Sequence, residues 1–203
     1  MDWVVIQSRM GSKRFPGKCK KMIKGKFLIQ AVYDRCKLAC DNVLVAIPDN
    51  EYQYENLLDR EMIPFFKGHP TDLIDRYLKA AREHKMDRIV RITGDCPFIP
   101  PEYISHSLRL KGDFVSNCIL PCVDGFEVEV MSIKCLRWLY RYAPPGHHRE
   151  HVTSYLKQNL EQSELEVCSW SPSLDISIFP KLSIDTPGDL DRCRKYNIGE
   201  ELC

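Results

Sequence analysis

Short apolar runs alternate with amphipathic stretches along the first half of the chain, and this alternation is what most constrains the fold. The apolar runs are rich in β-branched residues, as strands are, and cover residues 3–7, 42–47, 64–66 and 88–92. The amphipathic stretches have apolar residues at helical spacing and cover residues 27–38, 51–60 and 71–84. Strands that alternate with helices in this way predict an α/β fold, with a mostly parallel sheet covered by helices on both faces.

The second half of the chain is less regular. Strands are predicted over residues 113–117, 125–131, 165–170 and 182–184, and helices over residues 132–142 and 148–159. A last helix is expected to begin at Pro187, because proline is tolerated in the first turn of a helix. The 203 residues are enough for a single domain.

Positive charge is concentrated near the start of the chain. Residues 1–40 hold ten Lys and Arg against two acidic residues, whereas the whole chain carries a formal charge of only +1. A local anion site fits this distribution better than binding to nucleic acid over the whole surface. A solvated basic face is the alternative that composition alone leaves open.

The ten cysteines do not indicate a secreted disulfide scaffold, because the chain is long and starts without a signal-like segment. We therefore expect free thiols and a cytoplasmic protein. No stretch approaches the roughly 20 apolar residues that span a bilayer, so no membrane partner is expected. Cys36-x3-Cys40 and Cys118-x3-Cys122 lack zinc-site spacing backed by a second pair and are interpreted as structural.

Three polar segments follow predicted strands, and ligands of parallel sheets gather beyond the carboxyl ends of the strands. The segments are Ser8–Lys18, Pro48–Asn50 and Thr93–Pro97. The first is the most informative, because it combines two glycines with four cations, Arg9, Lys13, Arg14 and Lys18. Backbone donors with such charge suit a triphosphate, although an incidental basic turn has the same composition. The spacing is not that of a Walker A loop.

This loop resembles the Arg-x-Gly-Ser-x-Arg-x-Pro-Gly-Lys loop of the cytidylyltransferases of the spore-coat-polysaccharide and acylneuraminate (CMP-sugar synthetase) type. The resemblance continues in order along nearly the whole chain, through residues 45–50, 66–68, 72–77, 90–97, 116–117, 124–130, 149–153 and 183–190. The stretch between Thr153 and Ser183 looks shorter than in relatives, which often build acceptor or dimer contacts there. The resemblance therefore does not specify the sugar or the oligomeric state.

The resemblance implies a Rossmann-like, glycosyltransferase-A-type fold with a small acceptor-side extension. Residues 1–112 would form the nucleotide-binding half and residues 113–203 the acceptor-binding half, which contributes the second metal ligand. The implied reaction transfers a cytidylyl group from CTP to a small acidic sugar of the 2-keto-3-deoxy type. It gives a CMP-sugar, such as that of a nonulosonic acid for polysaccharide biosynthesis, and pyrophosphate. The resemblance is also compatible with a homodimer.

Particular residues take roles from the family pattern. Asp95 and Asp185 would hold Mg²⁺, with Mn²⁺ as an alternative, and would share catalysis with Lys18 and Arg14. The nucleotide would be bound by Arg9, Met10, Gly11, Ser12, Arg14, Lys18, Ala46, Asp49, Asn50, Arg76, Thr93 and Gly94. The acceptor would be bound by Asn117, Glu127, Glu129, Arg149 and His151. Two of these assignments have open alternatives. Arg76 could pair with Asp72 on its own helix, and Glu127 and Glu129 could form the solvent face of a strand.

Two other functions are weighed. An enzyme that joins a nucleoside triphosphate to a sugar 1-phosphate would need a further phosphate-binding cation in the acceptor half. A non-catalytic nucleotide-binding relative is disfavoured, because Lys18, Asp95 and Asp185 are all present. His147–His151 contains the H-x-x-E-H spelling of a zinc peptidase, but Pro144, Pro145 and Gly146 directly precede it and would interrupt the long helix that this motif needs.

Overall fold

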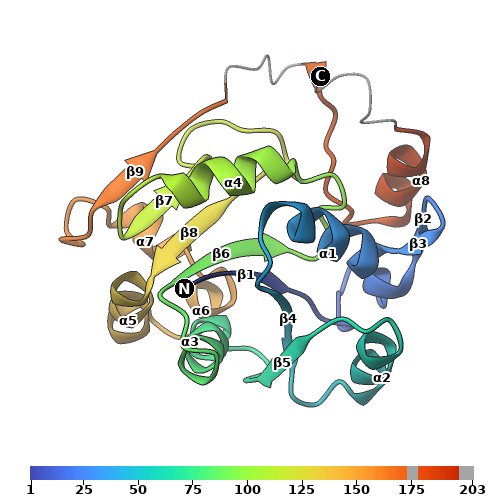
Figure 1. Cartoon of the computed structure of the whole chain (residues 1–203), viewed down its shortest axis with the longest axis horizontal. Helices are drawn as coiled ribbons and strands as arrows, with labels where there is room; N and C mark the ends of the chain where they lie inside the picture. The colour runs from blue at the N-terminus through green and yellow to red at the C-terminus, as the bar shows by residue number, and fades with distance from the viewer. Residues whose placement is uncertain (173–177, 197–203) are drawn as a thin grey trace.

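The computed structural model describes residues 1–172 and 178–196, and its centre is a seven-stranded sheet (Figure 1). In spatial order the strands are β5 (Phe65–Gly68), β4 (Val43–Pro48), β1 (Asp2–Gln7), β6 (Arg88–Thr93), β8 (Glu129–Ser132), β7 (Phe114–Ser116) and β9 (Val167–Ser169). Among these strands only β8 runs against its neighbours, whereas the other pairings are parallel. The sheet is therefore mostly parallel, as the sequence predicts.

Helices cover both faces of the sheet. One face carries α1 (Leu28–Ala39), α2 (Tyr52–Arg60) and α4 (Pro101–Arg109), and the other carries α3 (Leu73–Glu83), α5 (Ile133–Tyr142) and α7 (Ser154–Gln158). Successive residues of a strand point to opposite faces. Val4 and Ile6 accordingly pack in the core under α1, whereas Val5 packs in the core under α3. Burial on both faces explains why the strands read as continuous apolar runs.

A third apolar cluster holds the last described helix, α8 (Pro187–Lys195), against the start of the chain. Leu190 and Cys193 pack with Phe15 of the basic loop and with Ile184. A small hairpin of β2 (Met22–Ile23) and β3 (Lys26–Phe27) contributes to the same cluster. This packing brings residues near 185 close to residues near 18.

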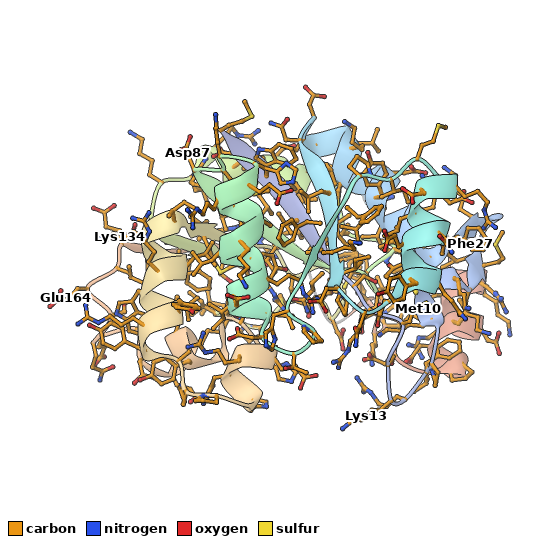
Figure 2. The ribbon with its side chains drawn as sticks, turned by 90° about the horizontal axis from the view of Figure 1, so that it is seen from below. Met10, Lys13, Phe27, Asp87, Lys134 and Glu164 are labelled. Carbon is orange, nitrogen blue, oxygen red and sulfur yellow. The ribbon has the colours of Figure 1, made fainter. Side chains whose placement is uncertain are left out.

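The chain reverses its direction of travel across the sheet between β1 and β6. From β1 it proceeds to β4 and β5 on one side, and then crosses to β6 on the other. Such a switch point leaves a crevice at the carboxyl ends of the two strands. Figure 2 shows Lys13, which follows β1, at the opposite end of the molecule from Asp87, which precedes β6. The basic loop therefore lies at the carboxyl ends of the strands.

The predicted elements of the first half are confirmed to within a few residues, except that α4 and the β2–β3 hairpin were not predicted. Three predictions in the second half were wrong. The strand expected over 125–131 is confined to Glu129–Ser132, and the helix expected over 148–159 is split into α6 (His147–Glu150) and α7. Residues 182–184 do not form a strand, and Ser183 lies in a bend.

Side-chain contacts explain these differences. The Asn117 amide donates to Phe126 O and accepts from Val128 N, both at 2.8 Å, and so takes the place of ladder partners before β8. The helix expected over 148–159 breaks where Thr153 turns inward and donates to Glu129 Oε1 at 2.8 Å. Leu182 N and Ile184 N donate to Asp124 O and Asp95 O, which are loop carbonyls rather than strand partners.

Within residues 1–172 and 178–196, none of the helices has the length and apolar character that crossing a membrane requires.

Gly125 offers a test of the packing that shapes the second half. Its φ is +106°, and an added Cβ would lie 2.7 Å from the backbone of Leu182 and Ser183. We expect Gly125→Ala to lower the free energy of unfolding by at least about 2 kcal/mol, from backbone strain together with this clash. Chemical denaturation measures the loss.

The matched control is Gly25→Ala. Gly25 also has a positive φ, +81°, but an added Cβ would meet nothing within 4 Å. Only the conformational strain, about 1 kcal/mol, is then expected. Equal losses in the two variants would show that residues 182–183 yield to the added methyl group.

Candidate active site

The basic loop that follows β1 is closed by its own backbone. Gly17 N donates to Met10 O at 2.9 Å, and Ser8 N donates to Ala46 O of β4 at 3.2 Å. Two N–H groups of the loop donate to the Glu51 carboxylate, which lies outside the loop. Met10 N donates to both carboxylate oxygens at 2.9 Å, and Gly11 N donates to one of them at 3.3 Å. Met10 and Gly11 are predicted to bind the nucleotide, but in this structure their N–H groups are directed to Glu51 and not to the cavity.

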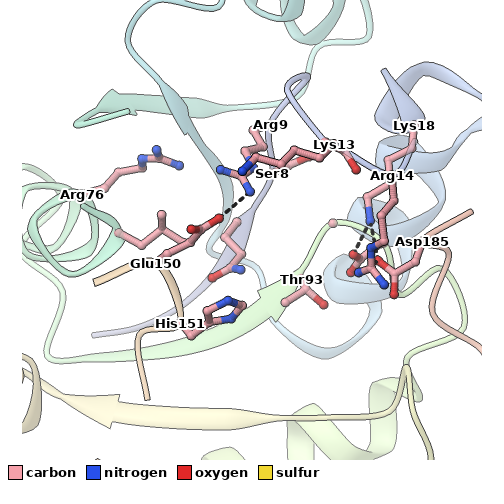
Figure 3. Close-up of a pocket in the computed structure, with 15 residues that line it drawn as sticks. Ser8, Arg9, Lys13, Arg14, Lys18, Arg76, Thr93, Glu150, His151 and Asp185 are labelled. Atoms are coloured by element: carbon pink, nitrogen blue, oxygen red, sulfur yellow. Dashed lines mark hydrogen bonds and ion pairs between the residues drawn. The ribbon is translucent and has the colours of Figure 1, made fainter. Parts of the chain in front are cut away.

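A cavity of about 420 Å³ opens beside this loop (Figure 3). It is lined by Gln7, Ser8, Arg9, Ser12, Lys13, Arg14, Lys18, Leu73, Arg76, Thr93, Gly94, Asp95, Glu150, His151 and Asp185. The four loop cations predicted from the sequence all line it. The close approach of the strand ends depends on Gly94, because a Cβ there would lie 2.8 Å from Ser8 Cβ.

Lys18 joins two carboxylates in this cavity. Its Nζ lies 2.6 Å from Asp95 Oδ2 and 3.2 Å from Asp185 Oδ1. The same Lys18 Nζ also donates to Ile184 O at 2.8 Å. The structure thus brings together residues 18, 95 and 185 from three distant parts of the chain, as Figure 3 shows for the labelled Lys18 and Asp185.

Asp185 has further cationic partners. Arg14 Nη2 lies 2.8 Å from Oδ1, and Lys181 Nζ lies 2.7 Å from Oδ2. Burial acts to raise the pKa of Asp185, but the hydrogen bonds from Lys181 and Lys18 outweigh it and hold the pKa below its ordinary value. The backbone of Asp185 is fixed by α8, because its N–H donates to the Asp189 carboxylate at 3.0 Å. Asp185 is thus an ionised carboxylate whose backbone is hydrogen-bonded to α8.

The residues present fit a divalent metal. Both carboxylates converge on the Lys18 ammonium, and Mg²⁺ commonly takes one or two carboxylates together with substrate phosphate oxygens. In the part of the chain that the structure describes, no group of three or more His, Cys, Asp or Glu side chains could hold a metal ion. Ligands from a substrate would have to complete a site at Asp95 and Asp185.

Arg9 crosses one end of the cavity to a segment far away in the sequence. Its Nη2 lies 2.6 Å from Glu150 Oε1, a contact visible in Figure 3. The hydrogen bond from Arg9 lowers the pKa of Glu150. Glu150 was not predicted from the sequence, because its neighbours Arg149 and His151 matched the acceptor pattern instead.

Four of the residues predicted to bind the nucleotide, Ala46, Asp49, Asn50 and Arg76, lie outside the basic loop and differ in position. Arg76 lines the cavity although it is buried, and it donates to His69 O at 2.6 Å and to Pro70 O at 3.0 Å. Its expected alternative, an ion pair with Asp72, is wrong, because Asp72 caps α3 and pairs with Arg149. Asp49 and Asn50 are exposed and Ala46 is buried, and none of the three lines the cavity.

A second cavity, of about 430 Å³, continues from the first. The two share Gln7, Thr93, Asp95 and His151 in their walls. The remaining lining residues of the second cavity are Arg91, Cys96, Cys118, Asp124, Glu127, Glu129, Thr153, Ser154, Lys157 and Ser183. One continuous cleft therefore runs from the basic loop to the region between β6, β8 and α7.

A buried carboxylate organises the second cavity. Glu129 is 1% exposed and pairs with Arg91 and with Lys157 Nζ, the latter at 2.7 Å. Burial acts to raise the pKa of Glu129, but the two cations and Thr153 lower it to about 2. The solvent-face interpretation of Glu129 is therefore wrong. The sequence did not predict Lys157 as a site residue. It places Lys157 within one long helix over residues 148–159, and nothing in that pattern indicates that its side chain points into the cavity.

The other predicted acceptor residues have different surroundings. Glu127 lines the second cavity, and burial raises its pKa. His151 lines both cavities, and burial followed by the nearby His147 lowers its pKa, which favours neutral imidazole. Asn117 is 1% exposed and lines neither cavity. Its side-chain amide is hydrogen-bonded to the backbone of Phe126 and Val128 instead.

Arg149 is also absent from the walls of both cavities. Its guanidinium donates to Ala143 O at 3.0 Å and to Tyr140 O at 2.7 Å, and it pairs with Asp72. These contacts tie α6 to α5 and α3, so the predicted acceptor role of Arg149 is not supported. The H-x-x-E-H spelling falls on α6, which ends at Glu150 after a single turn and cannot present a zinc-peptidase helix.

Comparisons with known proteins agree with this geometry. A family model described as cytidylyltransferase matches residues 3–170. The spore coat polysaccharide biosynthesis protein SpsF of Bacillus subtilis is 29% identical over 76% of this chain and 69% of its own length. A 3-deoxy-manno-octulosonate cytidylyltransferase of Pelobacter propionicus is 35% identical over 70% of this chain and 52% of its own length.

A solved structure of a cytidylyltransferase from Leptospira borgpetersenii is also similar. It has a TM-score of 0.88 at 28% identity and covers 95% of this chain and 84% of its own. The chain spans between about half and about two thirds of the length of the curated relatives that it matches first.

The buried pair of Glu129 and Arg91 predicts a pH dependence of stability. Because the folded-state pKa of Glu129 is about 2, below its ordinary value of 4.5, the ionised carboxylate stabilises the fold above about pH 4.5. This contribution, on the order of 3 kcal/mol, is lost as the pH falls from 4.5 towards 2. Urea unfolding of the wild type and of Glu129→Gln at a series of pH values measures it.

At neutral pH Glu129→Gln is expected to be the less stable protein, because Arg91 keeps its charge without its partner. The difference between the two proteins should shrink below pH 4.5. Glu161→Gln, which alters an exposed carboxyl group, is the control and should follow the wild type. A difference that is constant down to pH 2 would contradict the ionised state of Glu129.

Proposed function

This chain belongs to the cytidylyltransferase family, and we propose that it transfers a cytidylyl group from CTP to a sugar hydroxyl, with release of pyrophosphate. The observation that carries the proposal is the convergence of Lys18, Asp95 and Asp185 in a cavity that Arg9, Lys13 and Arg14 also line. The cations suit a triphosphate, and the two carboxylates suit the divalent ion that accompanies one.

Positioning and charge neutralisation dominate this class of reaction. The sugar hydroxyl attacks the α-phosphorus of CTP, so that an oxygen–phosphorus bond forms and the bond to the β-phosphate oxygen breaks. Lys18 and Arg14 stabilise the charge of the departing pyrophosphate, and Arg9 and Lys13 orient the triphosphate. Mg²⁺ held by Asp95 and Asp185 would polarise a phosphoryl oxygen.

The attacking hydroxyl is assigned to the second cavity. His151 lies where the two cavities meet, and its lowered pKa leaves the imidazole able to accept a proton. In this proposal His151 takes the proton of the acceptor hydroxyl. Glu127, whose pKa is raised, faces the same cavity and binds sugar hydroxyls.

Charge in the second cavity bears on the acceptor. Among the residues that the structure describes, its walls contain four carboxyl groups, from Asp95, Asp124, Glu127 and Glu129, and two permanent cations, from Arg91 and Lys157. Arg91 and Lys157 both pair with Glu129, and Lys157 is the more exposed of the two. A dianionic sugar 1-phosphate suits this cavity poorly. A sugar acid of the 2-keto-3-deoxy type, with a single carboxylate near Lys157, suits it better, and the product would be a CMP-sugar for polysaccharide synthesis.

Titration calorimetry of the protein with CTP, UTP, ATP and GTP, each with Mg²⁺, tests the nucleotide. Selective binding of CTP is expected, and pyrophosphate release with keto-acid sugars then tests the acceptor. Preference for another nucleotide, with turnover of a sugar 1-phosphate, would replace the proposal by the pyrophosphorylase alternative. Binding of CTP without pyrophosphate release for any sugar would favour the non-catalytic nucleotide-binding relative, and failure to bind any nucleotide would contradict the proposal.

Replacement of the two central groups should abolish most of the activity. Lys18→Ala and Asp95→Asn are each expected to lower kcat by about 10²- to 10³-fold, because each removes charge that contacts the triphosphate or its metal. The rate of pyrophosphate release measures the loss, and circular dichroism confirms that the variants fold.

Lys26→Ala is the matched control. Lys26 belongs to the same basic segment and pairs with the Asp34 carboxylate, but it lines neither cavity. Its kcat should equal that of the wild type. Near-normal kcat and KM for CTP in folded Lys18→Ala would contradict the role of Lys18.

A further inference from the structure

Two cysteine side chains meet at the edge of the second cavity. Cys118 and Cys122 lie four residues apart in the loop between β7 and β8, and each thiol alters the pKa of the other. Both are half-buried, and neither is in a disulfide. Cys118 lines the cavity itself. Because the two residues belong to neither strand, a bond between them would break no pairing of the sheet.

The surroundings of the two thiols differ. Lys157 Nζ lies 3.1 Å from Cys118 Sγ, and the Ser116 hydroxyl lies 3.2 Å from it. The Cys122 thiol, aided by the charge of Lys157 and opposed by burial and by Glu129, lowers the pKa of Cys118. The pKa of Cys122 is raised, first by its interaction with Cys118 and then by burial. The Lys157 ammonium contacts only the Cys118 sulfur of the two, and a cation beside a thiol favours its thiolate form.

Buried cysteines elsewhere in the molecule do not share this setting. Cys36 and Cys135 are fully buried in the apolar core, where burial raises their pKa. Cys96 also lines the second cavity, but it is buried and its pKa is likewise raised. A thiolate reacts with oxidants and a thiol does not, so Cys118 has the features of a reactive cysteine with a resolving partner.

We propose that Cys118 and Cys122 are a reversible oxidation site, converted by hydroperoxides into a disulfide at the wall of the second cavity. The Cys118 thiolate attacks the peroxide, so that a sulfur–oxygen bond forms, the oxygen–oxygen bond breaks, and hydroxide or alkoxide leaves. The Cys122 sulfur then attacks the resulting sulfenic acid and expels water as the disulfide forms. The dithiol loses two electrons and the peroxide gains them.

Oxidation changes the cavity through Lys157. The disulfide removes the thiolate partner of the ammonium and fixes the loop beside Glu129. An effect on activity rests on the proposed function, in which the second cavity binds the acceptor. Oxidation should then change the KM for the acceptor by about tenfold and leave the KM for CTP unchanged. The formation of the disulfide does not depend on that function.

The chemical test uses mass spectrometry. The protein is treated with limiting hydrogen peroxide, free thiols are alkylated, and the chain is cut by trypsin, which releases both cysteines in one peptide, residues 112–134. We expect this peptide to resist alkylation at both cysteines and to be lighter by two hydrogen atoms. Dithiothreitol should restore both alkylation sites.

Variants separate the two steps. Cys122→Ser should stop the reaction at a sulfenic acid on Cys118, which dimedone traps, and should leave activity before oxidation unchanged because Cys122 does not line the cavity. Cys168→Ser removes a half-buried cysteine of β9 as the matched control, and it should form the disulfide as the wild type does.

Two results would overturn the proposal. One is alkylation of both cysteines after peroxide treatment that oxidises Cys168. The other is a Cys118 that reacts with iodoacetamide no faster than Cys168 does. If the disulfide forms but neither KM changes, the oxidation site stands and its link to the acceptor is refuted. If CTP does not bind at all, the proposed function fails while the peptide result is unaffected.

Discussion

The ammonium of Lys18 is the contact on which the rest of the site depends. It holds carboxylates from the end of β6 and from the segment before α8, and it also donates to Ile184 O. Without this cation, two acidic groups would face each other in a partly buried cavity and repel. The loop, the sheet and the last helix are thus joined by charge as well as by the apolar cluster around Phe15.

Charge is distributed unevenly along the cleft, and the two ends suit different chemical groups. The first cavity carries Arg9, Lys13, Arg14 and Lys18 on one side, whereas the second is dominated by carboxyl groups. An anion entering the cleft is therefore drawn to the basic loop rather than to the region around Glu129. The two cavities meet at Asp95 and His151, which line both of them. A group bound in one cavity would therefore lie next to a group bound in the other.

The parallel sheet and the strand ends could be predicted from sequence, because burial on both faces leaves a strong apolar pattern at β1, β4 and β6. The convergence of Lys18, Asp95 and Asp185 was also predictable, from a resemblance to a family. Other features depend on side-chain contacts that no local pattern reveals. Arg149 is held by carbonyls of α5, and Lys157 is drawn inward by a buried glutamate.

The position of Asp185 has a consequence for synthesis of the protein. A ribosome makes every chain from its N-terminal side, so Lys18 and Asp95 leave it long before Asp185 and the helix that supports it. Until α8 has formed, its apolar partners near Phe15 stay uncovered and the site lacks one of its two carboxylates. The growing chain can therefore fold most of its sheet before α8 docks and completes the cluster of Lys18, Asp95 and Asp185.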